Sequence, residues 1–222
     1  MADPAPQTFT PALGKAWLTP AYDAAIALMT REKVWRTALV RDIAPQRSMR
    51  ILDIGCGTGA LLLAISGTEP SADLAGLDPD PSVLARAKRK ARKREARITF
   101  IEGFFGEASL PDGWQPDVIT SSLVLHQVPM AEKRRILSQA FDILPVGGRL
   151  VIADYGLQRT KLMRTLFRNT VQRLDGIEDT IPNADGVLPL LMEQAGFEDV
   201  RETKIVPTVT GSISIYSANR GA

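Results

Sequence analysis

The sequence has few of the residues that build disulfides and metal centres. Its 222 residues include one cysteine, Cys56, and one histidine, His126. A single cysteine excludes an internal disulfide and a multi-cysteine metal site, and it favours the reducing cytoplasm as the location. One histidine leaves little material for a zinc or non-haem iron centre, so we expect no bound metal.

Long apolar runs are lacking as well. No stretch approaches the ~20 apolar residues that span a bilayer. Residues 1–9 are rich in Pro and Ala and do not have the basic region and apolar stretch of a secretory signal. The hydrophobic share of 45% and the charged share of 23% are ordinary for a globular protein. A chain of this length fits one α/β domain with small additions.

Charge is placed unevenly along the chain, although the formal net charge is only +2. Residues 85–97 contain eight Lys or Arg and one Glu. This run lacks interleaved aromatic residues that could stack on bases, so we expect no nucleic-acid partner. Residues 161–174 read as an amphipathic helix that carries Arg164, Arg168 and Arg173. Together the two basic segments make a peripheral membrane contact possible, against the commoner alternative of solvated charged faces.

Strand-like and helix-like segments alternate along most of the chain. Such alternation implies right-handed crossovers and a mostly parallel sheet. Near the end, two helices are followed by two strands joined by a short turn, which predicts a closing hairpin. We therefore expect one Rossmann-like, doubly wound α/β domain with seven strands, mostly parallel, the last one antiparallel. The predicted strands are 50–54, 73–77, 98–102, 117–121, 149–153, 200–206 and 212–216, and the predicted helices are 21–44, 59–66, 82–94, 130–143, 161–174 and 187–195.

The glycine-rich segment 55–59 is the most informative part of the sequence. It follows a buried strand and precedes a helix, so its backbone can turn sharply and approach a ligand closely. The free N–H groups of the next helix can bind a carboxylate. Asp78 ends the next strand, 25 residues after Asp53. A carboxylate at that place can accept hydrogen bonds from both ribose hydroxyls of an adenosine.

Two other interpretations of this loop have to be weighed: a turn without a ligand, and a site for NAD. Gly55, Gly57 and Ala60 satisfy the loose dinucleotide pattern G-x-G-x-x-G/A, which is weak by itself. Asp53 argues against NAD, because an acid two residues before the first glycine would repel a pyrophosphate and attract a cationic amino group. Gly59 gives the spacing G-x-G-x-G, and a plain dinucleotide-binding domain does not require the terminal hairpin.

Residues 51–59 resemble motif I of the class I S-adenosylmethionine (SAM)-dependent methyltransferases. The similarity continues through the acidic end of the second strand at 78–80, the fourth strand and its loop at 117–127, and the Gly-Gly turn at 144–148. It covers residues 50 to 216 and is greatest for small-molecule enzymes of the ubiquinone/menaquinone C-methyltransferase group. The resemblance therefore implies SAM as the cofactor and methyl transfer as the activity.

The resemblance also implies roles for individual residues. Asp53 and the glycine loop would hold the methionine part, Asp78 the ribose, and Pro79 would flank the adenine. One departure stands out: the family usually has Gly-Asp-Ala after the third strand, where this chain has Gly103-Phe104-Phe105. Either a backbone carbonyl or Glu107 replaces the missing acid, or packing alone holds the adenine; both phenylalanines could instead be ordinary core. The expected cofactor-binding residues are Asp53, Gly55, Cys56, Gly57, Gly59, Asp78, Pro79, Gly103, Phe104, Phe105, Ser121 and Leu123.

Three polar residues near the ends of the fourth and fifth strands are candidates for catalysis. In methyl transfer the cofactor carries the hard chemistry, and a base helps only if the acceptor must lose a proton. His126 is the candidate base, because its reference pKa of ~6.5 suits proton transfer near neutrality. The alternative is a histidine that bonds a loop or caps a helix. Asp154 and Tyr155 could orient an acceptor or be satisfied loop residues.

In the family, the N-terminal segment and the insert after the fifth strand cover the acceptor. Here these segments supply Trp17 and Tyr22 on one side and Met163 and Phe167 on the other, together with His126. Their character suggests a small apolar or aromatic acceptor, lipid-like or quinone-like, although each could simply pack in the core. Two alternatives stay open: a SAM-binding protein without transferase activity and an NAD-dependent oxidoreductase. The expected division is a helical cover at 1–45, a SAM-binding core at 46–155, an acceptor-side insert at 156–198 and a hairpin at 199–217.

Overall fold

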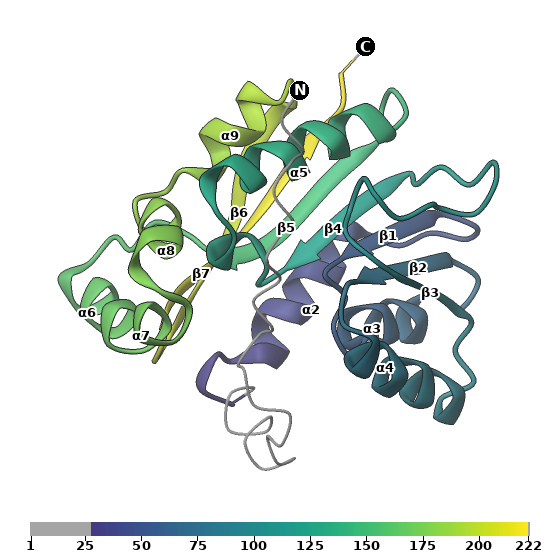
Figure 1. Cartoon of the computed structure of the whole chain (residues 1–222), viewed down its shortest axis with the longest axis horizontal. Coiled ribbons are helices and arrows are strands. Elements are labelled where there is room, and N and C mark those ends of the chain that lie inside the picture. The colour runs from purple at the N-terminus through teal and green to yellow at the C-terminus, as the bar shows by residue number, and fades with distance from the viewer. Residues whose placement is uncertain (1–27, 222) are drawn as a thin grey trace, which may run out of the picture.

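The computed structural model describes residues 28–221. Its centre is a seven-stranded sheet with the order β3-β2-β1-β4-β5-β7-β6 (Figure 1). The first five strands pair in parallel, whereas β7 runs antiparallel to both β5 and β6. The predicted Rossmann-like fold is confirmed. The strands are β1 (Arg50–Ile54), β2 (Asp73–Asp78), β3 (Ile98–Glu102), β4 (Val118–Ser122), β5 (Arg149–Tyr155), β6 (Glu198–Thr208) and β7 (Gly211–Asn219).

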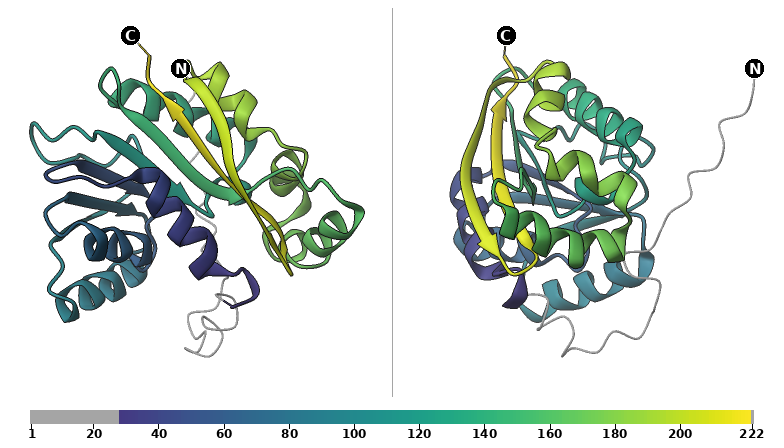
Figure 2. Two further views of the ribbon diagram at one scale, coloured as in Figure 1. Left: turned by 180° about the vertical axis from the view of Figure 1, so that it is seen from behind. Right: turned by 90° about the vertical axis from the view of Figure 1, so that its left-hand side faces the viewer.

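Helices cover both faces of the sheet and bury its central strands. One apolar cluster joins α2, α3 and α4 to one face, and a second joins α5 and α9 to the other (Figure 2). Central strands that are buried on both faces read as short continuous apolar runs, which is why the sequence revealed them. The helices are α2 (Glu32–Ile43), α3 (Ala60–Thr68), α4 (Pro81–Lys93), α5 (Met130–Ile143), α6 (Lys161–Asn169), α7 (Val171–Asp175), α8 (Ile177–Ala184) and α9 (Leu188–Gln194), with a 3-10 turn η1 at Leu125–Gln127.

The prediction of one helix over 161–174 was wrong. Thr170 leaves the helical region, with φ −116° and ψ −81°, and separates α6 from α7. Its hydroxyl donates to the carbonyl of Leu166 at 2.7 Å, a side-chain bond that competes with the backbone hydrogen bonds of a helix. The helix α8 was not predicted; it contains Pro182 and follows Gly176.

Two other boundaries also differ. The helix predicted over 21–44 is interrupted: residues 28 and 29 are helical, Thr30 and Arg31 form a turn with Arg31 in a left-handed conformation, and α2 begins at Glu32. The strands of the hairpin extend beyond the predicted 200–206 and 212–216, because β7 is paired along its length between β5 and β6.

The helices α6, α7 and α8 gather at one end of the molecule, on the left of Figure 1. We call residues 161–184, which contain these three helices, the helical cap. β5 leads directly into this cap, so the cap lies at the edge of the sheet where the parallel strands end. Within residues 28–221, none of the helices has the length and apolar character needed to cross a bilayer.

Candidate cofactor and acceptor site

A cavity of about 660 Å³ lies where β1, β2 and β4 end. Open α/β sheets bind their ligands at this edge. Eight of the expected cofactor residues line it: Gly55, Gly57, Asp78, Pro79, Gly103, Phe104, Phe105 and Leu123.

The glycine loop is fixed in a conformation that only small residues allow. The backbone N–H groups of Gly55 and Cys56 both donate to the carbonyl of Leu77, at 2.8 and 3.0 Å. Gly55 has φ +68°, and a Cβ there would lie 2.4 Å from a methyl group of Val124. Cys56 is buried in the core, and Gly59 caps α3 with φ +73°. Neither of these two lines the cavity, so the structure places them behind the loop.

Asp78 is held in place at the cavity wall by the loop itself. Its carboxylate accepts hydrogen bonds from the backbone N–H of Gly57 at 2.8 Å and of Asp80 at 3.0 Å. Burial raises the pKa of Asp78, while these two N–H groups lower it. The result is an oriented carboxylate at the position where a ribose would need an acceptor.

Asp53 lies under the loop and is completely buried. Neither of its carboxylate oxygens has a hydrogen-bond partner among the described residues. Burial raises the pKa of Asp53 to about 8; Arg36 opposes this rise and Asp78 adds to it. A buried carboxylate without a partner is costly unless a cation or donor reaches it. The amino group of the methionine part of SAM is such a cation, so these residues fit the cofactor.

Binding of S-adenosylhomocysteine should release a proton from Asp53. At pH 7 a carboxyl with a pKa of about 8 is mostly protonated, and pairing with an ammonium group favours the ionised form. The binding enthalpy should therefore depend on the ionisation enthalpy of the buffer, with up to one proton released. Calorimetry in two buffers measures this. An Asp53→Asn variant with an undiminished buffer dependence would assign the proton to another group.

The part of the cavity where the resemblance implies the adenine is lined by two phenylalanines. Phe104 and Phe105 both line it, whereas Glu107 does not. The carbonyl of Phe104 accepts from the N–H groups of Glu107 and Ala108, and the carbonyl of Phe105 accepts from Arg135 at 2.8 Å. Both carbonyls are thus already used within the protein, which favours adenine binding by packing.

The loop after β4 is organised by one buried carboxylate. Asp154 accepts hydrogen bonds from the backbone N–H groups of Val124, Leu125 and Tyr155 at 3.1, 2.7 and 2.7 Å. It also lies 2.7 Å from Nδ1 of His126. Asp154 therefore shapes the loop that closes one side of the cavity.

Two serines and a leucine at the end of β4 take different positions. Ser121 is buried and donates to the carbonyl of Ile54 at 2.9 Å, so it joins β4 to β1. Ser122 and Leu123 line the cavity in its place. Leu123 has φ +57°, a rare conformation for a leucine that turns the chain towards η1.

His126 is enclosed between two carboxylates. Nδ1 faces Asp154, and Nε2 lies 3.3 Å from the carboxylate of Asp175 at the end of α7. Burial by itself lowers the pKa of His126, but Asp154 and Asp175 together outweigh it and raise the pKa to about 9. Because both ring nitrogens face carboxylates, neither is free to take a proton in this arrangement. A role as base stays a prediction. Tyr155 is buried, with its hydroxyl 2.8 Å from that of Thr210.

The raised pKa of His126 predicts how stability depends on pH. A group whose pKa is higher in the folded than in the unfolded protein stabilises the fold below the unfolded pKa. We expect the contribution of His126 to be complete below pH ~6.5 and to be lost as the pH rises through about 9. Denaturant unfolding at pH 6 and pH 9.5 measures it. Relative to a His126→Gln variant, the wild type should lose stability over this range. An equal change in the free energy of unfolding of both proteins would show that His126 is not charged in the folded protein.

Of the predicted acceptor residues that the structure describes, Met163, Phe167 and His126 do not line the cavity. Phe167 is buried in the core, with its ring 5.1 Å from that of Tyr155. Met163 lies on α6 and does not line the cavity, and Trp17 and Tyr22 fall outside the described residues. The far wall is formed by residues that no sequence motif indicated. These are Ser122, Val124, Gln127, Val128, Pro129, Glu132, Ile136 and Asp179.

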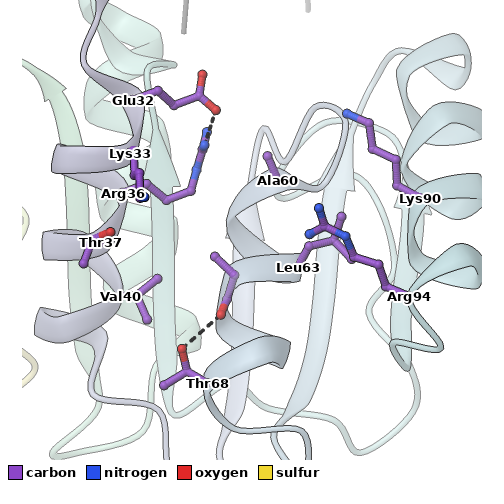
Figure 3. Close-up of a pocket in the computed structure, with 11 residues that line it drawn as sticks. Glu32, Lys33, Arg36, Thr37, Val40, Ala60, Leu63, Thr68, Lys90 and Arg94 are labelled. Atoms are coloured by element: carbon purple, nitrogen blue, oxygen red, sulfur yellow. Dashed lines mark hydrogen bonds and ion pairs between the residues drawn. The ribbon is translucent and has the colours of Figure 1, made fainter. Parts of the chain in front are cut away.

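A second hollow of about 740 Å³ lies between α2, α3 and α4 (Figure 3). Lys33 and Arg36 line it from α2, and Lys90 and Arg94 from the basic run of α4. Lys90 donates to the hydroxyl of Thr58 at 2.7 Å, and Arg36 pairs with Glu32. Neither the glycine loop 55–59 nor Asp78 lines this groove. The cavity at the ends of the strands is therefore the candidate cofactor site.

Comparison with known proteins agrees with the geometry. A family model described as a methyltransferase domain matches residues 51–148. The chain is 27% identical over 222 aligned positions to the ubiquinone/menaquinone biosynthesis C-methyltransferase UbiE of Syntrophotalea carbinolica, covering 91% of each chain. Among solved structures it resembles magnesium protoporphyrin IX methyltransferase of Synechocystis with bound S-adenosylhomocysteine. The TM-score is 0.66 at 19% identity, with 94% of this chain and 90% of that one covered.

A third similar protein is human N-acetylserotonin methyltransferase in complex with SAM, with a TM-score of 0.64 at 21% identity. The match covers 89% of this chain but 55% of the human one. The matched residues include the glycine loop, and the sheet order agrees with the fold of these structures. The matched domain, the relatives and the fold together support a class I SAM-dependent methyltransferase with SAM as its cofactor.

Proposed function

We propose that the protein transfers a methyl group from SAM to a ring carbon of a small, apolar, quinone-like acceptor. The observation that carries this proposal is a cavity in which groups suited to the cofactor meet a far wall of apolar and polar residues in equal number. The similarity to a ubiquinone/menaquinone C-methyltransferase supports carbon as the acceptor atom and a quinone-like ring as the substrate.

The residues at the cofactor end have separate roles in this proposal. Asp53 pairs with the amino group, Asp78 accepts from the ribose hydroxyls, and Pro79 and Phe104 flank the adenine. SAM supplies a methyl carbon that is already activated by its sulfonium. The protein mainly aligns the acceptor with that carbon, and such alignment contributes ~7–11 kcal/mol to lowering the barrier.

The far wall suits an aromatic ring that bears a hydroxyl group. Val128 and Ile136 offer apolar contact, while Gln127 and Asp179 are polar. Methylation at a ring carbon is easier once the neighbouring hydroxyl loses its proton, so a carboxylate at the ring is useful. Glu132 already pairs with Arg135. We therefore assign the orientation of the acceptor hydroxyl to Asp179.

The remaining parts of the proposal concern the division of the chain and its location. Residues 46–155 form the cofactor-binding core, and 156–198 form the acceptor side, with 1–45 as a cover and 199–217 as the hairpin. We place the protein in the cytoplasm, consistent with a lone, buried Cys56. Leu162 and Leu174 are exposed on the helical cap, which also carries Arg168 and Arg173, and this supports a peripheral contact with anionic lipid.

A panel of acceptors tests the function directly. Purified protein with SAM is incubated with alkyl-substituted hydroquinones, naphthohydroquinones, phenols and amines, and products are identified by mass spectrometry and NMR. We expect a carbon-methylated quinol as the main product. A methyl ether or a methylamine as the product would identify oxygen or nitrogen, rather than carbon, as the acceptor atom. Binding of S-adenosylhomocysteine without turnover of any acceptor would favour a SAM-binding protein without transferase activity.

A further inference from the structure

Two buried cations lie at the junction between the loop after β4 and the helical cap. The first is His126 on η1, which is 5% exposed. It lies between Asp154 of β5 at 2.7 Å and Asp175 of α7 at 3.3 Å. Tyr155 packs edge-on against the imidazole, with ring centroids 5.0 Å apart. His126 thus connects the carboxylate that shapes the loop to the carboxylate that ends α7.

The second cation is Lys133 on α5, which is fully buried. Its ammonium group donates to the carbonyl of Val128 in the loop at 2.5 Å and to the carbonyl of Asp179 on α8 at 2.9 Å. Burial lowers the pKa of Lys133 to about 8, and the nearby Asp154 and Asp179 oppose this effect. One side chain therefore holds the loop and the cap at the same time.

The contacts made by these cations bear on the cavity. Val128 and Asp179, the two residues whose carbonyls Lys133 binds, both line it. The neighbouring Asn183 donates to the carbonyl of Tyr155 at 3.0 Å, so α8 is also bound to the end of β5. A shift of α7 and α8 away from the loop would therefore move Asp179 and change the far wall without touching Asp53 or Asp78.

We propose that His126, Lys133 and Asp175 form a buried latch that holds α7 and α8 against the loop after β4 and so sets the acceptor end of the cavity. They are positioning residues that act through Asp179 and Gln127. Buried charges are costly, and apolar residues of similar size often stabilise a fold equally well. Two cations at this one junction are therefore better explained by the need to hold a defined geometry than by stability alone. The effect on the acceptor rests on the function proposed above, whereas the effect on the cap does not.

The decisive variant is Asp175→Asn, which removes one charge but keeps the size of a side chain that is 21% exposed. The matched control is Asp185→Asn, which removes an exposed carboxylate directly after α8 that is paired with Arg164 of α6. The first readout is hydrogen exchange, which needs no acceptor. We expect the amides of α7 and α8 to exchange at least tenfold faster in Asp175→Asn, and within twofold of the wild type in the control.

The second readout is NMR titration of the imidazole, which is unambiguous because His126 is the only histidine in the sequence. Any affinity tag is removed first. With Asp154 still facing Nδ1 and Tyr155 and Lys133 nearby, loss of Asp175 should lower the pKa from about 9 by roughly one unit or more. With an accepted substrate, the acceptor KM should rise about tenfold, while affinity for S-adenosylhomocysteine stays within twofold.

A second variant, Lys133→Gln, tests the other half of the latch and should also increase exchange in α8. Unchanged exchange of α7 and α8 in both variants would overturn the latch. A lower kcat at unchanged acceptor KM in Asp175→Asn would also overturn it, because that pattern assigns Asp175 to the chemical step. If no acceptor is methylated by the wild type, the proposed function fails, while exchange and titration still decide whether the latch exists.

Discussion

Replacing Asp78 by alanine should abolish measurable binding of S-adenosylhomocysteine. Asp78 accepts from Gly57 and Asp80 and presents its carboxylate to the cavity, so the change removes the ribose acceptor and the support of the loop together. A hydrogen bond to a charged group contributes ~1.5–3 kcal/mol, and two ribose hydroxyls would therefore account for a loss of at least ~100-fold in affinity. Calorimetric titration measures this loss directly, starting from a wild-type affinity near micromolar.

The control for this experiment is Asp112→Ala, which removes an exposed carboxylate from the loop before β4. It should bind S-adenosylhomocysteine like the wild type. Circular dichroism of Asp78→Ala should show an intact fold, because the sheet does not depend on this side chain. An affinity of Asp78→Ala within threefold of the wild type would place the ribose elsewhere in the cavity.

Replacing Asp154 by alanine should cause the largest loss of stability of any substitution considered. Three backbone N–H groups would lose their acceptor, and His126 would lose the nearer of its two counter-charges. Removing one partner from a buried charge pair costs ~3–5 kcal/mol. Urea unfolding followed by tryptophan fluorescence measures the difference.

An exposed ion pair on the same half of the molecule supplies the comparison. Asp185→Ala breaks the pair with Arg164, in which both side chains are about half exposed, and pairs of this kind contribute ~0–1 kcal/mol. If Asp154→Ala lost no more stability than this control, the loop after β4 would be held by other contacts. His126 would then be stabilised mainly by Asp175.

The central part of the fold was predictable because its signals are local. Each parallel strand is buried on both faces and therefore reads as an apolar run, and Gly and Pro mark the turns. The cap was not predictable in the same way. The hydroxyl of Thr170 also donates to the carbonyl of Thr210 in the β6–β7 turn, a contact between distant parts of the chain that accompanies the break between α6 and α7.

The site shows the same division. The cofactor end follows from motif I and the acid at the end of the next strand, because a tight turn and a ribose acceptor need particular residue types at fixed places. The acceptor end could not be predicted from a motif, because Gln127, Glu132 and Asp179 come from three separate elements. Phe167, which looked like an acceptor residue by its apolar character, packs in the core instead.

The sequence by itself thus determined the α/β class, the mostly parallel sheet and eight of the residues that line the cavity. Only the tertiary structure decided the state of His126. In the sequence it is a lone histidine after a strand, with an ordinary pKa as the natural assumption. In the fold, Asp154 and Asp175 approach it from β5 and α7, 28 and 49 residues away in the chain. Its charge depends on these two distances, and no local pattern encodes contacts between segments so far apart.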